Sequence, residues 1–342
     1  MRHKRWLLFT LIIGAGLLCL WKLQGRESNL IHHAVRLIPL GPGSESKAAY
    51  CGRISDKEII LLDVHGRPRI HVTALDVNTR SSRDLTGLSN YLLQKIGNSG
   101  AMNLTLVVAP GGDKVLWINF PKAGITDISG RMDVPLDKYL SDVAGLPRIG
   151  VWPLWSPDGR RWALTIYGSG VDYSYLASRT TGTIDGSIAI NDPITPPVND
   201  HRLYHAPALT NDGALICTDG RLGAFKIPKG ISSGSPFTLD GLEKEADRIE
   251  YRVTSTGRLV WTCSVNPREQ SAFAEWLSKA MHTSRDVSLC LRVNNLDGSH
   301  GREIGRITAA EGADDIELQG VSPEGKWAEF THGGWLYTTR IQ

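Results

Sequence analysis

The chain has 342 residues, of which 41% are hydrophobic and 21% charged, and this balance excludes wholesale disorder. Lysine and arginine exceed the acidic residues by three, and much of this excess precedes residue 6, so a basic nucleic-acid groove is not indicated. The 36 glycines, 17 prolines and 10 tryptophans, with few stretches that could hold a long helix, indicate an all-β protein.

The N-terminal segment combines basic residues with an apolar run. Residues 1–5 contain Arg2, Lys4 and Arg5, and residues 6–21 carry no charge. This run is long for the core of a signal peptide and slightly short for a membrane helix. Because no pair of small residues marks a cleavage site, we expect residues 6–24 to be a retained transmembrane anchor, with a cleaved signal peptide as the alternative.

The charge distribution also predicts the orientation of this anchor. Basic residues before the run place residues 1–5 in the cytoplasm, by the positive-inside rule. The body would then be extracytoplasmic, in the periplasm or on the cell surface, and it would be secreted if the segment is cleaved. Residues 25–48 are predicted to form a linker with a possible closing strand, and residues 49–342 the folded body.

A strand, tight turn and strand recur along this body. The turn occurs at residues 156–159, 210–213 and 322–325, with weaker copies at 109–112 and 254–257. Proline fixes φ early in such a turn, Asp or Asn caps it, and Gly supplies the positive φ. After each turn comes an apolar run with alternation, such as residues 161–167, as in a packed strand.

The spacing of the turns indicates four-stranded units. The turn glycines recur roughly every 45 to 70 residues, which suits the blades of a propeller. The longest interval contains residues 267–282, whose apolar residues have helical spacing, so we predict one inserted amphipathic helix there. Shorter helices are predicted at residues 89–96 and 136–143.

These motifs support a resemblance to a known family. The turns at 156–159 and 322–325, together with the Asp-Leu-Thr sequence that ends at Thr86, resemble the WD40-like repeats of TolB-type propellers. The resemblance covers about residues 50–340, and two of six copies carry the Ser-Pro-acid-Gly form. It implies a six-bladed β-propeller with a central funnel that binds a protein or a small ligand at one face.

Two motifs would carry chemistry in another fold. Residues 230–234 match the G-x-S-x-G elbow of serine hydrolases, but their surroundings are typical of a loop and lack the strand and helix that an elbow needs. His201 and His205 have the spacing of helical zinc ligands, yet on an innermost strand residues four apart lie about 13 Å from each other. We therefore expect neither a metal nor a cofactor.

The cysteines match no metal or redox spacing. Two of the five, Cys263 and Cys290, fall on strands of one predicted blade. In an oxidising compartment they could form a cross-strand disulfide, and the other interpretation is that they are buried free thiols.

A binding face is predicted from the repeat register. If the repeated turns lie at the bottom of the disc, the top rim carries aromatic and acidic residues that suit recognition of a protein, a peptide or a sugar. The predicted binding residues are Trp152, Asp172, Tyr173, Tyr204, His205, Asp315 and Glu317. The alternative for Trp152 and its neighbour Trp155 is that both simply pack between blades.

The sequence thus predicts a membrane-anchored, extracytoplasmic and non-catalytic protein-interaction or ligand-binding module, which is not an enzyme. The alternative is a propeller enzyme that acts on carbohydrate as a glycosidase or lyase. It would need carboxylates that converge on the funnel, and otherwise these are solvated loop charges. The candidates are Asp172, Glu250, Asp315 and Glu317.

Overall fold

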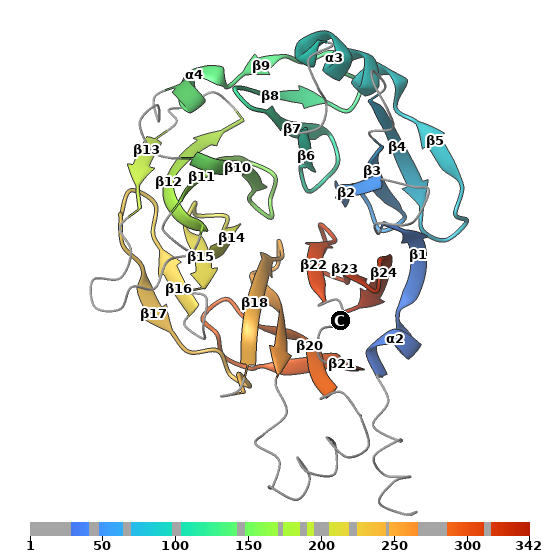
Figure 1. Ribbon diagram of the computed structural model, residues 1–342, viewed down its shortest axis with the longest axis vertical. Helices are drawn as coiled ribbons and strands as arrows, with labels where there is room; N and C mark the ends of the chain where they lie inside the picture. The colour runs from blue at the N-terminus through green and yellow to red at the C-terminus, as the bar shows by residue number, and fades with distance from the viewer. Residues whose placement is uncertain are drawn as a thin grey trace, which may run out of the picture.

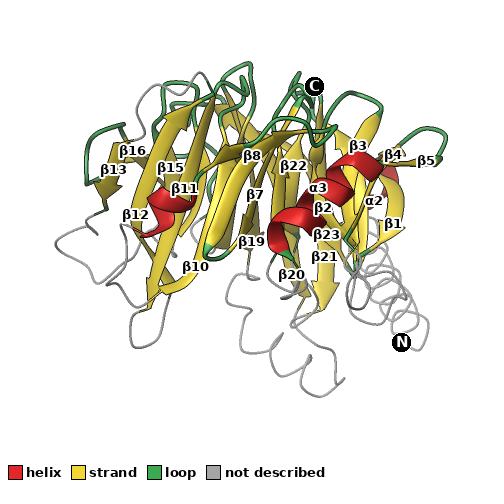
Figure 2. Ribbon diagram, turned by 90° about the horizontal axis from the view of Figure 1, so that it is seen from above, coloured by secondary structure: helices red, strands yellow, loops and turns green. Residues whose placement is uncertain are grey.

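The protein is a closed ring of six four-stranded antiparallel sheets around a central axis, as the computed structural model shows (Figure 1). The prediction of an all-β, six-bladed propeller is confirmed. Figure 2 shows the ring from the side, with the sheets standing side by side. The structure describes residues 29–40, 48–63, 70–97, 104–141, 148–169, 174–184, 190–194, 205–218, 224–243, 246–265, 286–310 and 316–342.

The first three blades follow the chain from the centre outward. Blade 1 contains β2 (Ala48–Arg53), β3 (Glu58–Asp63), β4 (His71–Asp76) and β5 (Ser82–Asp84). Blade 2 contains β6 (Thr105–Val108), β7 (Lys114–Asn119), β8 (Lys122–Asp127) and β9 (Val134–Pro135). Blade 3 contains β10 (Arg148–Trp155), β11 (Arg161–Ser169), β12 (Ser174–Thr183) and β13 (Ile190–Pro193).

The last three blades include one that joins both ends of the chain. Blade 4 contains β14 (His205–Leu209), β15 (Leu215–Thr218), β16 (Ala224–Ile227) and β17 (Ser235–Phe237). Blade 5 contains β18 (Ala246–Val253), β19 (Arg258–Val265), β20 (Asp286–Asn295) and β21 (Arg302–Ala310). Blade 6 contains β22 (Glu317–Val321), β23 (Trp327–His332), β24 (Trp335–Arg340) and, outermost, β1 (Val35–Pro39).

The repeated turns join the first and second strands of blades, as predicted. In the turn of blade 3 the N–H of Gly159 donates to the carbonyl of Ser156 at 2.8 Å, and the same bond joins Gly325 to Ser322 in blade 6. Both glycines have φ near +70°, where a side chain would be strained. The serine hydroxyl accepts the N–H of Arg161 at 2.9 Å, which locks the hairpin.

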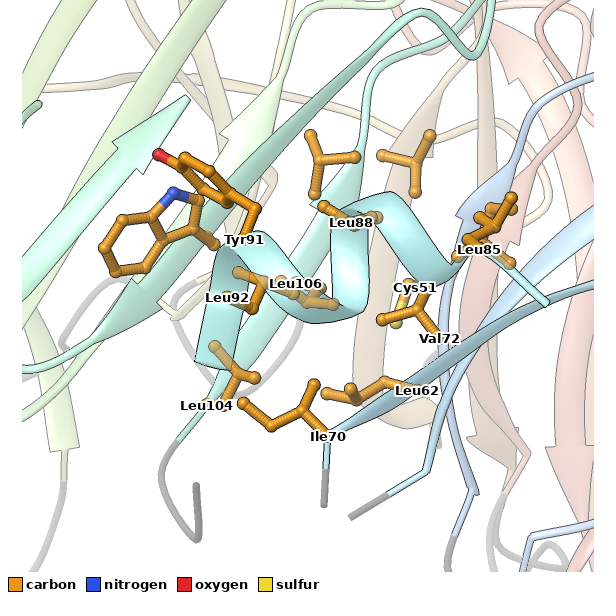
Figure 3. Packing of buried hydrophobic residues seen from close by; sticks show 14 of the residues in the cluster. Cys51, Leu62, Ile70, Val72, Leu85, Leu88, Tyr91, Leu92, Leu104 and Leu106 are labelled. Carbon is orange, nitrogen blue, oxygen red and sulfur yellow. The ribbon is translucent and has the colours of Figure 1, made fainter. Parts of the chain in front are cut away.

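The core is divided among the interfaces between blades. The buried apolar residues form six clusters, and each cluster joins two neighbouring blades. Figure 3 shows the cluster between blades 1 and 2, which helix α3 (Thr86–Ile96) covers with Leu88 and Leu92. Because each blade is apolar on both faces, a single sheet would leave one of them in water.

The short helices lie where the sequence indicated them. Helix α3 confirms the helix predicted at residues 89–96, although it begins three residues earlier. The first turn of α3 packs closely against Ser129, and only glycine fits at position 87. A Cβ there would lie 2.3 Å from the carbonyl oxygen of Ser129. Helix α4 (Asp137–Ser141) confirms part of the prediction for residues 136–143, and α2 (Asn29–His33) precedes β1. The helix predicted at residues 267–282 lies outside the described residues.

The ring is closed by the two ends of the chain. Strand β1 pairs antiparallel with β24, so that Val35 lies opposite Thr338. A buried ion pair across the same junction joins Arg53 of blade 1 to Glu329 of blade 6, and Thr338 donates to the same carboxylate. Burial raises the pKa of Glu329, and Arg53 opposes this rise because its positive charge favours the ionised carboxylate.

The membrane anchor falls on a part of the chain that the structure does not describe. None of the described helices is long and apolar enough to cross a membrane, and residues 6–24 lie outside the described ranges.

The closing ion pair yields a stability prediction. Changing Arg53 to Met should lower the free energy of unfolding by about 3–5 kcal/mol, because Glu329 would be left buried without its partner. Changing Arg83 to Met removes an exposed ion pair with Glu58 and should cost less than about 1 kcal/mol. Urea unfolding of the two variants measures the difference, and equal costs would contradict a role of the buried pair in closure.

Candidate ligand-binding channel

The innermost strands of the six blades enclose a cavity of about 1050 Å³. Strands β2, β6, β10, β14, β18 and β22 contact one another in sequence around the axis and contribute its walls. This volume lies at the upper end of the range for sites that bind small molecules. The cavity is therefore the channel of the propeller.

Two exposed aromatic side chains line the channel. Trp152 of β10 is 56% exposed, and Phe120 of the turn between β7 and β8 is 48% exposed. Trp155, three residues further along β10, is instead 8% exposed and donates its indole N–H to the carbonyl of Val107 at 2.9 Å. Because three positions along a strand reverse the face, Trp155 packs between blades and Trp152 does not. The alternative of interblade packing thus holds for Trp155 alone.

Strand β18 carries the two charged groups that are central to the channel. Glu250 and Arg252 are two residues apart and so lie on one face of the strand, while Tyr251 between them is buried against blade 4. Glu250 accepts the N–H of Leu318 at 2.7 Å, and the Nε of Arg252 donates to the carbonyl of Gln319 at 3.3 Å. These two side chains therefore bind the backbone of β22, the innermost strand of the next blade.

A second polar group lines the channel where blades 1 and 6 meet. The hydroxyl of Tyr50 donates to Glu329 at 3.2 Å, and Arg53 is bonded to the same carboxylate. Tyr50 lies over Gly320, where a Cβ would be 2.5 Å from the phenol oxygen. The charge of Arg53 is thus neutralised within the wall.

The phenols of the channel stay protonated at neutral pH. Burial raises the pKa of Tyr167 and, with the carboxylate of Glu329, that of Tyr50. Cys217 adds to the rise at Tyr167. Tyr167, on β11 of blade 3, is therefore a neutral hydrogen-bonding group in the wall.

The predicted rim residues are only partly described. Trp152 lines the channel, whereas Glu317 is exposed and accepts from Gln319 and Thr331 at 3.4 Å. His205 begins β14, and its side chain lies outside the described residues. The other four also lie outside them: Asp172, Tyr173, Tyr204 and Asp315. Their role in binding stays a prediction.

Only one of the predicted carboxylates is found at the channel wall. Glu250 lines the cavity, Glu317 is not among the lining residues, and Asp172 and Asp315 are outside the described ranges. The sequence analysis did not identify three other residues that line the channel: Arg252, Tyr50 and Phe120. The signal for Arg252 was available, since charged residues alternate with Ile249, Tyr251 and Val253 along an innermost strand.

Of the two alternative catalytic motifs, the structure describes only the one at residues 230–234. Residues 230–234 form part of the exposed loop before β17, with no helix after them, so the interpretation as a loop is confirmed. His201 lies outside the described residues.

The described cysteines are all buried free thiols. Cys263 and Cys290 lie directly opposite each other on β19 and β20. Cys290 also lies within 4.8 Å of Glu243 and Glu303, but Arg306 binds both carboxylates at 2.6 and 2.9 Å. The carboxylates of this cluster are thus already paired with a cation of the protein.

The two tryptophans of β10 should respond differently to truncation. Trp152→Ala should cost less than about 1 kcal/mol of unfolding free energy, because its side chain is mostly exposed. Trp155→Ala should cost about 3–5 kcal/mol, because it empties a packed site and leaves the carbonyl of Val107 without its donor. Thermal or urea unfolding measures both, and a Trp152→Ala variant as unstable as Trp155→Ala would contradict the placement of Trp152 in the channel.

Comparison with known proteins finds the fold but no family. No family model and no curated protein matches the chain. Among solved structures, an oligogalacturonate lyase in complex with manganese has 8% identity and a TM-score of 0.48, over 88% of this chain and 74% of that one. Virginiamycin B lyase from Staphylococcus aureus has 11% identity and a TM-score of 0.43, over 90% and 98%. YCF48 bound to D1 peptide has 9% identity and a TM-score of 0.41, over 90% and 95%.

These likenesses correct one expectation. At such identities they show the β-propeller fold alone, and nothing matches that would assign the chain to the TolB family. The expectation that the protein is not an enzyme is corrected, because it rested on the propeller fold, and structures of this fold include lyases as well as a peptide-bound protein. The propeller fold gives no reason to exclude catalysis.

Proposed function

We propose that the protein binds a carbohydrate in its central channel and acts on it as a propeller enzyme. One observation carries this proposal. The exposed side chain of Trp152 lies in the same cavity as the carboxylate of Glu250 and the guanidinium of Arg252. An aromatic surface with a few placed polar groups is the usual composition of a small-molecule site.

Each of these groups has a role that its chemistry supports. The flat ring of Trp152 can pack against the apolar face of a sugar, because more than half of the residue's surface is exposed. The neutral phenol of Tyr167 can donate a hydrogen bond to a sugar oxygen. Glu250 is the group we assign to proton transfer, because breaking a glycosidic bond by hydrolysis or elimination requires a positioned acid or base.

The contact between Glu250 and the backbone of β22 supports this assignment. One carboxylate oxygen accepts the N–H of Leu318 at 2.7 Å, and this bond fixes the direction of the side chain. A fixed carboxylate in a partly enclosed cavity is better placed for proton transfer than one on a flexible surface side chain. Asp172, Tyr173, Tyr204, His205, Asp315 and Glu317 remain proposed outer contacts at the rim.

The test is activity on a panel of neutral and acidic oligosaccharides, with products identified by mass spectrometry. We expect wild type to cleave at least one substrate and Glu250→Gln to lose about 100-fold or more, because the amide keeps the hydrogen bond from Leu318 but cannot transfer the proton. Glu324→Gln, at an exposed glutamate of the turn after β22, is the matched control and should keep full activity.

Three outcomes would contradict the proposal. If no oligosaccharide is bound or cleaved, the carbohydrate assignment is wrong. If peptides bind the channel and sugars do not, the ligand class is wrong. If Glu250→Gln cleaves as fast as Glu324→Gln, the assignment of proton transfer to Glu250 is wrong.

We further propose that residues 6–24 hold the propeller at the outer face of the cell membrane. An uncharged run after three basic residues supports this location. The full chain should remain in the membrane fraction after alkaline washing, and a chain that begins at residue 26 should be soluble. An intact mass that lacks the first residues would instead indicate a cleaved signal, and a full-length chain released by washing would contradict the anchor.

A further inference from the structure

Among the residues that the structure describes, no carboxylate contacts the guanidinium of Arg252. Its Nε donates to the carbonyl of Gln319 at 3.3 Å and its Nη1 to the carbonyl of Tyr251 at 2.7 Å, and both acceptors are backbone groups. Among the described residues no carboxylate forms an ion pair with it. A guanidinium has five N–H donors in a planar fork, so donors remain after these two bonds.

The neighbouring charges do not compensate for this cation by contact. Glu250 lies two residues away on the same strand face, at about 7 Å between Cα atoms, and its carboxylate accepts the N–H of Leu318. Glu329 is already bound by Arg53 and Tyr50. Arg252 therefore lies in the channel wall near the charge of Glu250, and in the described part of the chain no carboxylate is bonded to its guanidinium.

Burial disfavours the charged form of Arg252, and a bound anion would offset this cost. Burial lowers the pKa of Arg252, while Glu250, Tyr50 and Tyr167 oppose this change. A guanidinium nevertheless stays charged at neutral pH. In a partly enclosed cavity a charge gains more from an oppositely charged ligand than it would at the surface.

The geometry points to an anion-binding subsite at Arg252, so that the ligand of the channel carries a carboxylate, as a uronic acid does. This inference rests on the proposed function for the sugar part of the ligand but not for the anion. The planar fork of arginine matches the two oxygens of a carboxylate. Trp152 would hold the apolar part of the same ligand. Binding of the carboxylate would place the sugar beside Glu250.

The test compares matched ligands by calorimetry. One ligand is a uronate-containing oligosaccharide, and the other is the same oligosaccharide reduced at C6 to the neutral sugar. Wild type should bind the acidic form at least tenfold more tightly. Arg252→Gln should lose about 10- to 100-fold for the acidic form and leave the neutral form unchanged, because one charge-assisted contact is removed. The glutamine can still donate to the carbonyl of Gln319, and a thermal melt checks that the variant is folded.

Arg258→Gln is the matched control, since Arg258 is exposed at the start of β19 and is not among the residues that line the cavity. It should bind both sugars as wild type does. If Arg252→Gln does not fold, Arg252→Lys keeps the charge without the fork and should lose most of the preference for the acidic form. Equal binding of the two sugars by wild type, or an unchanged preference in the folded Arg252 variant, would overturn the anion subsite.

A second arm separates this inference from the proposed function. Acetate, sulfate and inorganic phosphate are added at constant ionic strength, and the melting temperatures of wild type and the Arg252 variant are compared. Stabilisation of wild type alone, without binding of any sugar, would keep the anion subsite and reject the carbohydrate. Preference for sulfate or phosphate over acetate would overturn the carboxylate class. Neutral sugar binding without any effect of anions would keep the carbohydrate and reject the subsite.

Discussion

The structure depends on burial of apolar surface between neighbouring sheets. Each blade has two apolar faces, and each of the six core clusters is shared by two blades. No blade therefore has a core of its own, and the stability of any one of them depends on the pair beside it. An open row of such sheets would leave two end faces in water, and closing the row removes both.

Closure of the ring also creates the channel. The innermost strands converge on the axis, and each is paired within its sheet on one side only. Without further contacts, the other backbone edge of each strand would be exposed in the channel. Side chains of one blade bind the innermost strand of a neighbouring blade: Glu250 and Arg252 bind β22 of the following blade, and Trp155 binds β6 of the preceding one. The groups that hold adjacent blades together are thus also the groups that face the cavity. A site built on them is as rigid as the ring itself, which suits precise positioning of a ligand.

The turns made most of the architecture predictable from sequence. Glycine ends the tight turn in five of the hairpins, and two of these turns also carry proline and an acidic residue, so five hairpins could be recognised without tertiary information. The hairpin of blade 1 was harder to recognise, because Ser55–Lys57 has no glycine. The start of α3 was missed because Gly87 disfavours a helix locally, and its close approach to Ser129 is a tertiary contact.

The channel was less predictable than the blades, for a geometric reason. Trp152 and Trp155 lie on opposite faces of the same innermost strand and are equally apolar, and only the neighbouring blades decide which of the two is buried. Arg252 was missed because its strand alternates in the ordinary manner of a half-buried strand. Its significance depends on the absence of a contacting carboxylate among the described residues, and that is a property of three-dimensional neighbours.

The pairing of β1 with β24 has a consequence for biosynthesis. The ribosome makes residues 35–39 before residues 335–340, and the strands of the other five blades are made in between. Until β24 has been made, β1 has no partner, and an unpaired edge strand is a template for association with other chains. The ring therefore stays open until residues 335–340 emerge, and a chain that stops before them would leave an open, aggregation-prone product.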